Sequence, residues 1–170
     1  MRAVVDTNVL VSALLRSGSP PAAVVQAMVR QLLEPVVCNA IMAEYRAVLP
    51  RPRLRLRTAD IEDLLALIEA QAQWVDVAAY DGHPPLPDPT DWPFIASALA
   101  VGCPVITGNT RDFPARLGVR VISAREWVEA EASQSSIAAL VRPHRDSIHT
   151  QPESHVHWAG FPDSDRCSHG

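Results

Sequence analysis

The sequence predicts a single α/β domain with a parallel sheet of about five strands flanked by helices. Short apolar runs alternate with longer stretches whose apolar residues recur every three or four positions, as in amphipathic helices. The length of 170 residues suits one ordinary domain, and 48% of the residues are hydrophobic. We expect the domain to span residues 1–132. Residues 133–170, rich in Ser, Pro, Asp and His, are expected to form a disordered tail.

The first part of the chain predicts two strands, each followed by a helix. A short apolar strand at 2–5 leads into a helical pattern from Val9 to Leu14. Ser19 is the expected cap of a second helix, because two prolines that suit a first helical turn follow it. A strand at 35–38 then precedes a helix that Asn39 is expected to cap. This order favours parallel pairing of the strands.

The second part of the chain continues the alternation. Thr58 is the expected cap of a long amphipathic helix. Another helix begins after Asp91 and ends at Gly102, a residue suited to helix ends. Ser123 and Glu126 have the spacing of a capping box and predict the start of the last helix. Three further strands are predicted at 74–77, 104–106 and 119–122.

Composition excludes several classes of function. The formal net charge of −4 gives no whole-protein attraction to nucleic acid, so such binding would need a local basic patch. Every one of the 15 basic residues is Arg, and the lack of Lys excludes a P-loop and a Schiff-base enzyme. Cys38, Cys103 and Cys167 are widely spaced, which predicts reduced thiols in a cytoplasmic protein. No apolar run approaches membrane-spanning length, and Asp6 interrupts the N-terminal one, which is therefore not a signal peptide.

Five acidic residues follow a strand or open a helix, namely Asp6, Glu44, Asp88, Asp91 and Asp112. Ligands of open α/β sheets bind beyond the carboxyl ends of the strands, where Asp6 and Asp112 are expected. Such carboxylates suit Mg²⁺ or Mn²⁺, which can activate water and shield a phosphodiester. His83 is the sole His of the expected domain, so no nucleophilic pairing competes. The residues therefore support a metal-assisted phosphodiesterase.

Each of these residues also has a purely structural interpretation. Asp88 and Asp91 could serve only as helix caps, and Asp112 only as a solvated loop residue. Glu44 could be an edge residue beside an apolar stripe. An alternating set of arginines is either solvated surface or a patch that holds RNA phosphates; it comprises Arg51, Arg53, Arg55 and Arg57. Since clustered carboxylates repel without a cation, Asp6→Asn is expected to raise the melting temperature in chelator.

Four segments, in their order and spacing, resemble the motifs of the PIN-domain ribonucleases. They are residues 4–13 (VVDTNVLVSA), 44–49 (EYRAVL), 88–91 (DPTD) and 107–113 (TGNTRDF). The likeness covers about residues 1–132, and within the family it is greatest to VapC-like toxins of type II toxin–antitoxin systems. It implies a flavodoxin-like, three-layer fold, dependence on Mg²⁺ or Mn²⁺, and cleavage of RNA. It also implies a cognate antitoxin that covers the site, and homodimerisation.

The same resemblance assigns roles to residues. It places Asp6, Glu44 and Asp88 at the centre of the site. The implied catalytic residues are Asp6, Glu44, Asp88 and Asp112, and the implied metal ligands are Asp6, Asp88, Asp91 and Asp112. Asn8 would orient the first turn, Thr107 would lie near the metal, and Asn109 would support the site.

Two positions depart from the family pattern. Asn109 stands where many members have Asp, which weakens a second metal position unless Asp112 supplies the charge. Trp92 stands where an acidic residue is common. A housekeeping RNA-processing nuclease of the same fold therefore stays open as an alternative, as does a degenerate PIN domain that only binds RNA or protein.

Overall fold

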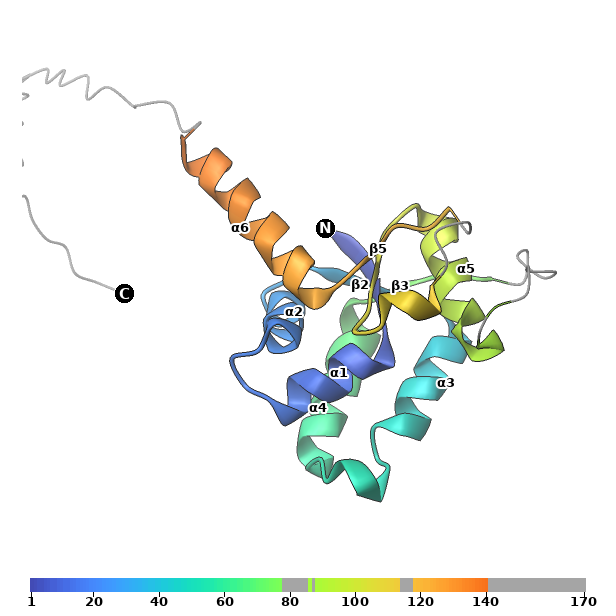
Figure 1. The fold of residues 1–170 in the computed structure, drawn as a ribbon. Helices are drawn as coiled ribbons and strands as arrows, with labels where there is room; N and C mark the ends of the chain where they lie inside the picture. Colours follow the sequence, from blue (N-terminus) through green and yellow to red (C-terminus); the bar gives the residue numbers. More distant parts are fainter. Residues whose placement is uncertain (78–85, 87, 114–117, 141–170) are drawn as a thin grey trace, which may run out of the picture.

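The computed structural model describes residues 1–77, 86, 88–113 and 118–140 (Figure 1). Its five strands form one parallel sheet in the order β3-β2-β1-β4-β5. The strands are β1 (Arg2–Val5), β2 (Glu34–Val37), β3 (Gln73–Trp74), β4 (Val105–Ile106) and β5 (Val121–Ile122). The predicted α/β fold with a parallel sheet is confirmed, and β1 lies at its centre.

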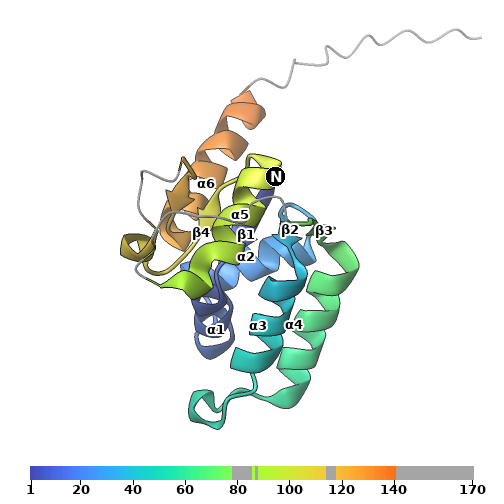
Figure 2. The same cartoon turned by 90° about the vertical axis from the view of Figure 1, so that its right-hand side faces the viewer.

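Helices surround this sheet. They are α1 (Thr7–Leu15), α2 (Pro20–Val29), α3 (Asn39–Val48), α4 (Thr58–Gln71), α5 (Trp92–Val101) and α6 (Ala124–Leu140). Three single turns of 3₁₀-helix are η1 (Pro52–Leu54), η3 (Pro89–Asp91) and η4 (Thr110–Asp112). Helix α5 packs on β1, β2 and β4 beside α3, whereas α2 packs with α1, α4 and α6. Figure 2 shows α5 in front of β1 and α2 behind it.

The central strand is buried on both faces, as expected of a parallel sheet covered by helices. Ala3, Val4 and Val5 are all buried, and the core continues through β2 and β4. Burial of this apolar surface is the main favourable contribution to folding, at roughly 25 cal/mol for each Å² removed from water. The chain leaves this core at Asp6, where β1 ends and α1 begins.

Three of the predicted helix boundaries are confirmed. The Ser19 hydroxyl accepts a hydrogen bond from the backbone of Ala22 at 3.3 Å. Gly102 ends α5 with a φ of 67°, a conformation that costs other residues about 1–2 kcal/mol. Ser123 and Glu126 form the predicted capping box at the start of α6.

Two predicted caps are wrong by one position. Asn39 and Thr58 are the first residues of α3 and α4, and the capping positions are held by Cys38 and Arg57. Neither Cys38 nor Arg57 makes a side-chain capping hydrogen bond. Asn and Thr are common capping residues, so sequence preference placed the caps at Asn39 and Thr58. In the structure, the helical conformation already begins at these two residues.

Strand β3 is shorter than the predicted strand at 74–77. It ends at Trp74, although one further ladder bond joins the Val75 amide to the Val37 carbonyl at 2.9 Å. The last predicted strand is likewise reduced to β5. Two of the remaining predicted positions, Pro104 and Arg120, still accept backbone hydrogen bonds from Val4 and Val105.

Helix α6 crosses the predicted domain boundary after residue 132. Its backbone continues to Leu140 and extends away from the body of the molecule (Figure 1). The rest of the expected tail, 141–170, lies outside the described residues, so the division of the chain at residue 132 stays a prediction. Among the described residues, no helix has the length and apolar character needed to cross a membrane.

Candidate functional site

Asp6 lies where the central strand ends, and three donors hold its carboxylate. Its Oδ2 atom accepts hydrogen bonds from Asn8 Nδ2 at 2.6 Å and from Thr107 Oγ1 at 2.5 Å. Its Oδ1 atom accepts from the Asn8 backbone at 3.2 Å. The Asp6 amide in turn donates to the Ile106 carbonyl at 2.9 Å. The carboxylate is therefore oriented from two neighbouring strands.

Asn8 joins the two loops that leave these strands. Its Oδ1 atom accepts a hydrogen bond from the Gly108 amide at 2.8 Å, and its Nδ2 atom lies 3.3 Å from Thr107 Oγ1. Gly108 suits this close approach, because an added Cβ would lie 3.0 Å from Asn8 Oδ1 and would push the Asn8 side chain aside. Asn8 and Thr107 thus both lie against Asp6.

Glu44 on α3 reaches the same edge through Thr7. Thr7 Oγ1 donates to Glu44 Oε1 at 2.5 Å, and Thr7 is itself buried. Burial raises the pKa of the Glu44 carboxyl, the Thr7 hydrogen bond opposes the rise, and the charges of Asp6 and Asp88 add to it. Glu44 therefore experiences the negative charge of two other candidate residues.

Tyr45, the residue after Glu44, links α3 to the central strand. Its hydroxyl donates to the carbonyl of Val5, the residue just before Asp6. The ring is buried and packs at an angle against Phe94 of α5. Burial, followed by the charges of Asp6 and Glu44, raises the Tyr45 pKa well above its usual value. Tyr45 thereby holds α3, and with it Glu44, against the end of β1.

Asp88 caps the turn that precedes α5. Its Oδ1 atom accepts from the Thr90 amide at 2.9 Å and from the Thr90 hydroxyl at 2.7 Å, and these bonds lower the pKa of the carboxyl. The side chain is exposed. Asp91, which is half-buried, occupies the N-cap position of α5 without making a side-chain capping bond. Asp88 is thus a cap in this structure, and its Oδ2 atom is not used in the two capping bonds.

Asn109 and Asp112 lie in the loop beyond β4. The Asn109 amide donates to Thr107 Oγ1 at 3.0 Å, and the residue is exposed. The backbone of Asp112 ends η4, but its side chain is outside the described part of the structure. Its predicted role as a ligand therefore stays a prediction.

The arginine-rich segment forms η1 and its flanks, between α3 and α4. All four of its arginines are exposed; they are Arg51, Arg53, Arg55 and Arg57. Arg51 lies close enough to Glu44 for its charge to lower the pKa of that carboxyl, although burial and the neighbouring acids outweigh it. Arg57 pairs loosely with Asp60 at 3.7 Å. One end of the segment therefore borders the acidic edge.

The donor set at this edge fits a hard divalent cation. Within the described residues, no three acidic, His or Cys side chains converge closely enough to form a ready-made metal site. Mg²⁺ is commonly bound through only one or two carboxylates, with water and substrate phosphate as the other ligands. Asp6 and Asp88, whose charges both act on Glu44, would match that mode of binding.

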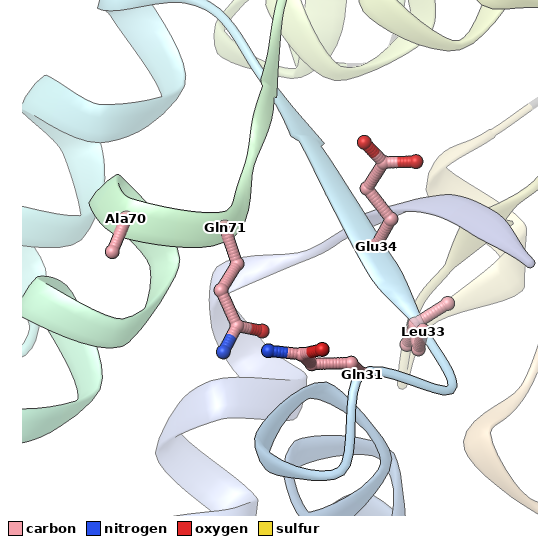
Figure 3. Close-up of a pocket in the computed structure, with 5 residues that line it drawn as sticks. All are labelled: Gln31, Leu33, Glu34, Ala70 and Gln71. Carbon is pink, nitrogen blue, oxygen red and sulfur yellow. The ribbon is translucent and has the colours of Figure 1, made fainter.

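Two surface cavities lie at opposite ends of β2. A cavity of about 360 Å³ lies at the opposite, amino end of β2, lined by Gln31, Leu33, Glu34, Ala70 and Gln71 (Figure 3). The amide groups of Gln31 and Gln71 point toward one another there, and none of the predicted site residues contributes to it. A larger cavity opens at the carboxyl end of β2, on the same edge as Asp6.

Comparison with known families agrees with this geometry. A model described as the PIN domain matches residues 2–111. The chain belongs to the PIN domain family. The matched range includes β1, α3, the turn of Asp88 and the start of the Thr107 loop, so it contains three of the four motif segments and residues 107–111 of the fourth, and it ends just before Asp112. No curated protein matches the chain at a significant level.

Three solved structures are similar to this PIN domain. VapBC2 from Rickettsia felis, bound to a DNA fragment from its promoter, gives a TM-score of 0.49 at 13% identity, over 72% of this chain and 98% of that one. VapBC-1 from nontypeable Haemophilus influenzae gives 0.47 at 15%, over 74% and 99%. FitAB bound to an IR36 DNA fragment gives 0.48 at 19%, over 73% and 95%. At these values the similarity carries no conclusion about activity.

Proposed function

We propose that this PIN domain is a metal-dependent endoribonuclease that hydrolyses RNA phosphodiester bonds. The observation that carries the proposal is the Asp6 carboxylate, which Asn8 and Thr107 orient at the carboxyl edge of the sheet, with Glu44 and Asp88 close by. Asp6, Glu44, Asp88 and Asp112 are the proposed catalytic residues. The proposed metal ligands are Asp6, Asp88, Asp91 and Asp112.

The bound Mg²⁺ or Mn²⁺ would supply an activated water and charge for the scissile phosphate. The protein's own side chains orient the carboxylates of the site. Thr107 and Asn8 hold the Asp6 carboxylate in one orientation, so little reorganisation is needed when a cation and RNA arrive. Thr7 does the same for Glu44, whose partial burial limits competing water.

The arginines of the η1 segment are the proposed contacts to the RNA backbone. The protein carries a net charge of −4 and its candidate site is acidic, so RNA phosphates need a local source of positive charge. Arg51 borders Glu44, and Arg53, Arg55 and Arg57 continue the exposed row. This arrangement would lead a single strand toward the acidic edge.

The motif resemblance further supports a role as the toxin of a toxin–antitoxin pair in the cytoplasm. Under this proposal the protein acts as a homodimer, and a cognate antitoxin protein binds over the site. Growth arrest on expression of the protein alone, relieved by the product of a neighbouring gene, would support that role. Normal growth would favour a housekeeping RNA-processing nuclease instead.

The nuclease proposal is tested by incubating purified protein with single-stranded RNA in Mg²⁺, Mn²⁺ or excess chelator. Cleavage is expected only with metal, and Asp6→Asn should remove most of it. Asp63→Asn is the matched control, because Asp63 is an exposed carboxylate on α4. Undiminished cleavage in chelator would refute metal dependence. RNA binding without cleavage in either metal would favour a degenerate binding domain.

A further inference from the structure

A cavity of about 650 Å³ lies at the carboxyl end of β2, and none of the candidate site residues described above lines it. It lies between the start of α3 and the segment that follows β3. Its lining residues are Cys38, Asn39, Ala40, Trp74, Val75, Asp76 and Val77. The walls thus come from two neighbouring strands and from the helix that carries Glu44.

Trp74 is the main apolar group of this cavity, and 46% of it is exposed. A large aromatic side chain is usually buried, since its burial contributes strongly to stability. Its backbone is nonetheless held firmly, because Trp74 pairs with Val37 and the next amide, that of Val75, donates to the Val37 carbonyl at 2.9 Å. The exposed indole therefore stands on a hydrogen-bonded backbone at the edge of the sheet, where β3 lies beside β2 (Figure 2).

The polar groups around the indole fit a nucleobase. Asn39 is exposed at the start of α3, and its amide both donates and accepts hydrogen bonds. Asp76 is exposed on the other wall and supplies acceptors. Unpaired bases are commonly bound by stacking on an aromatic ring while side chains contact their polar edges. The Trp74 ring offers a face for stacking, and Asn39 and Asp76, which line the same cavity, offer polar groups for the edge of a base.

The cavity is also at the right place for a nucleotide beside the proposed site. Asn39 and Glu44 lie on the same helix, with an axial separation of about 7.5 Å at the normal helical rise. Strand β3 is two strands away from β1, or about 10 Å at normal strand spacing. A base held on Trp74 would therefore belong to a nucleotide within one or two positions of a phosphate at Asp6.

We propose that this cavity is a base-binding subsite, in which Trp74 stacks on one unpaired base of the RNA next to the scissile bond. The proposal rests on the nuclease function proposed above and adds a preference for single-stranded substrate. Stacking is tolerant of base identity because every base has an aromatic face. Asn39 would then contribute any preference for one base.

The test measures binding of fluorescein-labelled single-stranded RNA in chelator, so that binding is independent of cleavage. Trp74→Ala should raise the dissociation constant about ten-fold, within the range known for the loss of one base stack. Trp74→Phe keeps a ring and should lose much less. Leu32→Ala is the control, because Leu32 is a large apolar residue that is also exposed, at 56%, but precedes the amino end of β2. It should bind RNA like the wild type.

A second arm places a single abasic nucleotide at successive positions of the RNA. One position should weaken wild-type binding about ten-fold and leave Trp74→Ala unaffected. Equal losses in both proteins at every position would overturn the subsite, as would wild-type affinity in Trp74→Ala. If Trp74→Ala fails to fold, the same comparison is made with Trp74→Phe, whose loss at that position should be reduced.

The outcomes separate the two proposals. Cleavage of RNA in Mn²⁺ with no effect of Trp74 would overturn the subsite alone. Binding that depends on Trp74, without cleavage in Mn²⁺, would overturn the nuclease function and leave a base-binding site.

Discussion

The oriented Asp6 carboxylate is the central feature at the scale of single residues. Three donors from two residues hold it before any cation is bound. Each hydrogen bond to a charged group contributes roughly 1.5–3 kcal/mol, so these bonds can offset much of the repulsion from neighbouring acids. Asp6 is therefore both a helix cap and a candidate ligand.

This geometry reverses the effect expected of Asp6→Asn from charge alone. Both oxygens of the Asp6 carboxylate accept hydrogen bonds, whereas the Asn side chain of the variant has only one oxygen. Its NH₂ group would face a donor, so at least one of the hydrogen bonds from Asn8 and Thr107 would be lost. For Glu44, burial outweighs the charge of Asp6 as a cause of its raised pKa, so relief of repulsion is the smaller effect. In chelator, we expect Asp6→Asn to be about 1–3 kcal/mol less stable than the wild type. A higher melting temperature for the variant would show that repulsion dominates.

Thr107 provides a second test at this scale, because its buried hydroxyl donates to Asp6 and accepts from the Asn109 amide. Thr107→Val keeps the shape and removes the hydroxyl, which should cost about 1–3 kcal/mol of stability. If the lost hydrogen bond raises the activation free energy of cleavage by about 1.4 kcal/mol, the cleavage rate should fall about ten-fold. Thr107→Ser keeps the hydroxyl and should retain most activity. Equal activity in the two variants would contradict the orienting role.

The residues of the site were predictable only in part. Asp6 could be singled out because it follows a predicted strand, and Glu44 because it stands beside an apolar helical stripe. The bridge from Thr7 to Glu44 could not, because it depends on how α1 lies against α3. The Tyr45 hydroxyl bond to Val5 was hidden for the same reason: Tyr45 has the spacing of an ordinary core residue.

At the scale of elements, the capping box fixes the start of α6. The Ser123 amide donates to Glu126 Oε2 at 2.7 Å, and the Glu126 amide donates to Ser123 Oγ at 3.1 Å. These bonds lower the pKa of Glu126. A carboxyl with a lowered folded-state pKa stabilises the fold above its unfolded-state pKa and loses that effect as the pH falls through the folded-state value.

Comparison of the wild type with Glu126→Gln tests this pH dependence. At pH 7 the wild type should melt higher, because only the carboxylate makes a charge-assisted bond. The difference should shrink as the pH is lowered through the acidic range to pH 3, since the unfolded-state pKa of Glu is about 4.3. Thermal melts at the two pH values measure it. A difference that does not change with pH would mean that the charge contributes nothing.

The η1 segment gives an element-scale test of RNA binding. Replacing Arg53 and Arg55 by Gln should weaken binding and reduce its salt dependence. Each lost phosphate contact removes about one unit from the slope of log affinity against log salt concentration. Binding is measured at several salt concentrations, and Arg125→Gln on the exposed face of α6 is the control. An unchanged slope in the double variant would leave η1 as solvated surface.

Elements were predicted more reliably than their ends. The alternation of apolar patterns predicted all five strands of the described sheet in order, because a parallel sheet requires helical crossovers. The lengths of β3 and β5 depend on which neighbouring backbone is available for pairing. Strand β3 has a partner on one side only, so its pairing ends soon after Trp74.

At the scale of the whole molecule, the strand order explains why distant segments meet. Strand β1 lies between β2 and β4, so the loops after these three strands share one edge. Asp6 and Thr107 are far apart in sequence and are brought into hydrogen-bonding contact there. Sequence pattern predicted the shared edge, but the strand order comes only from the structure.

The measurement that tests the central claim most directly uses RNA with a single 2′-deoxy substitution at the cleaved nucleotide. A water activated by metal at the Asp6 edge does not need the 2′-hydroxyl, so the wild type should cut this RNA in Mn²⁺ without producing a 2′,3′-cyclic phosphate. Asp6→Asn should cut it at least about a hundred-fold more slowly, and Asp63→Asn should cut it at the wild-type rate. Cleavage that the 2′-deoxy substitution abolishes, or that Asp6→Asn leaves unchanged, would contradict the account.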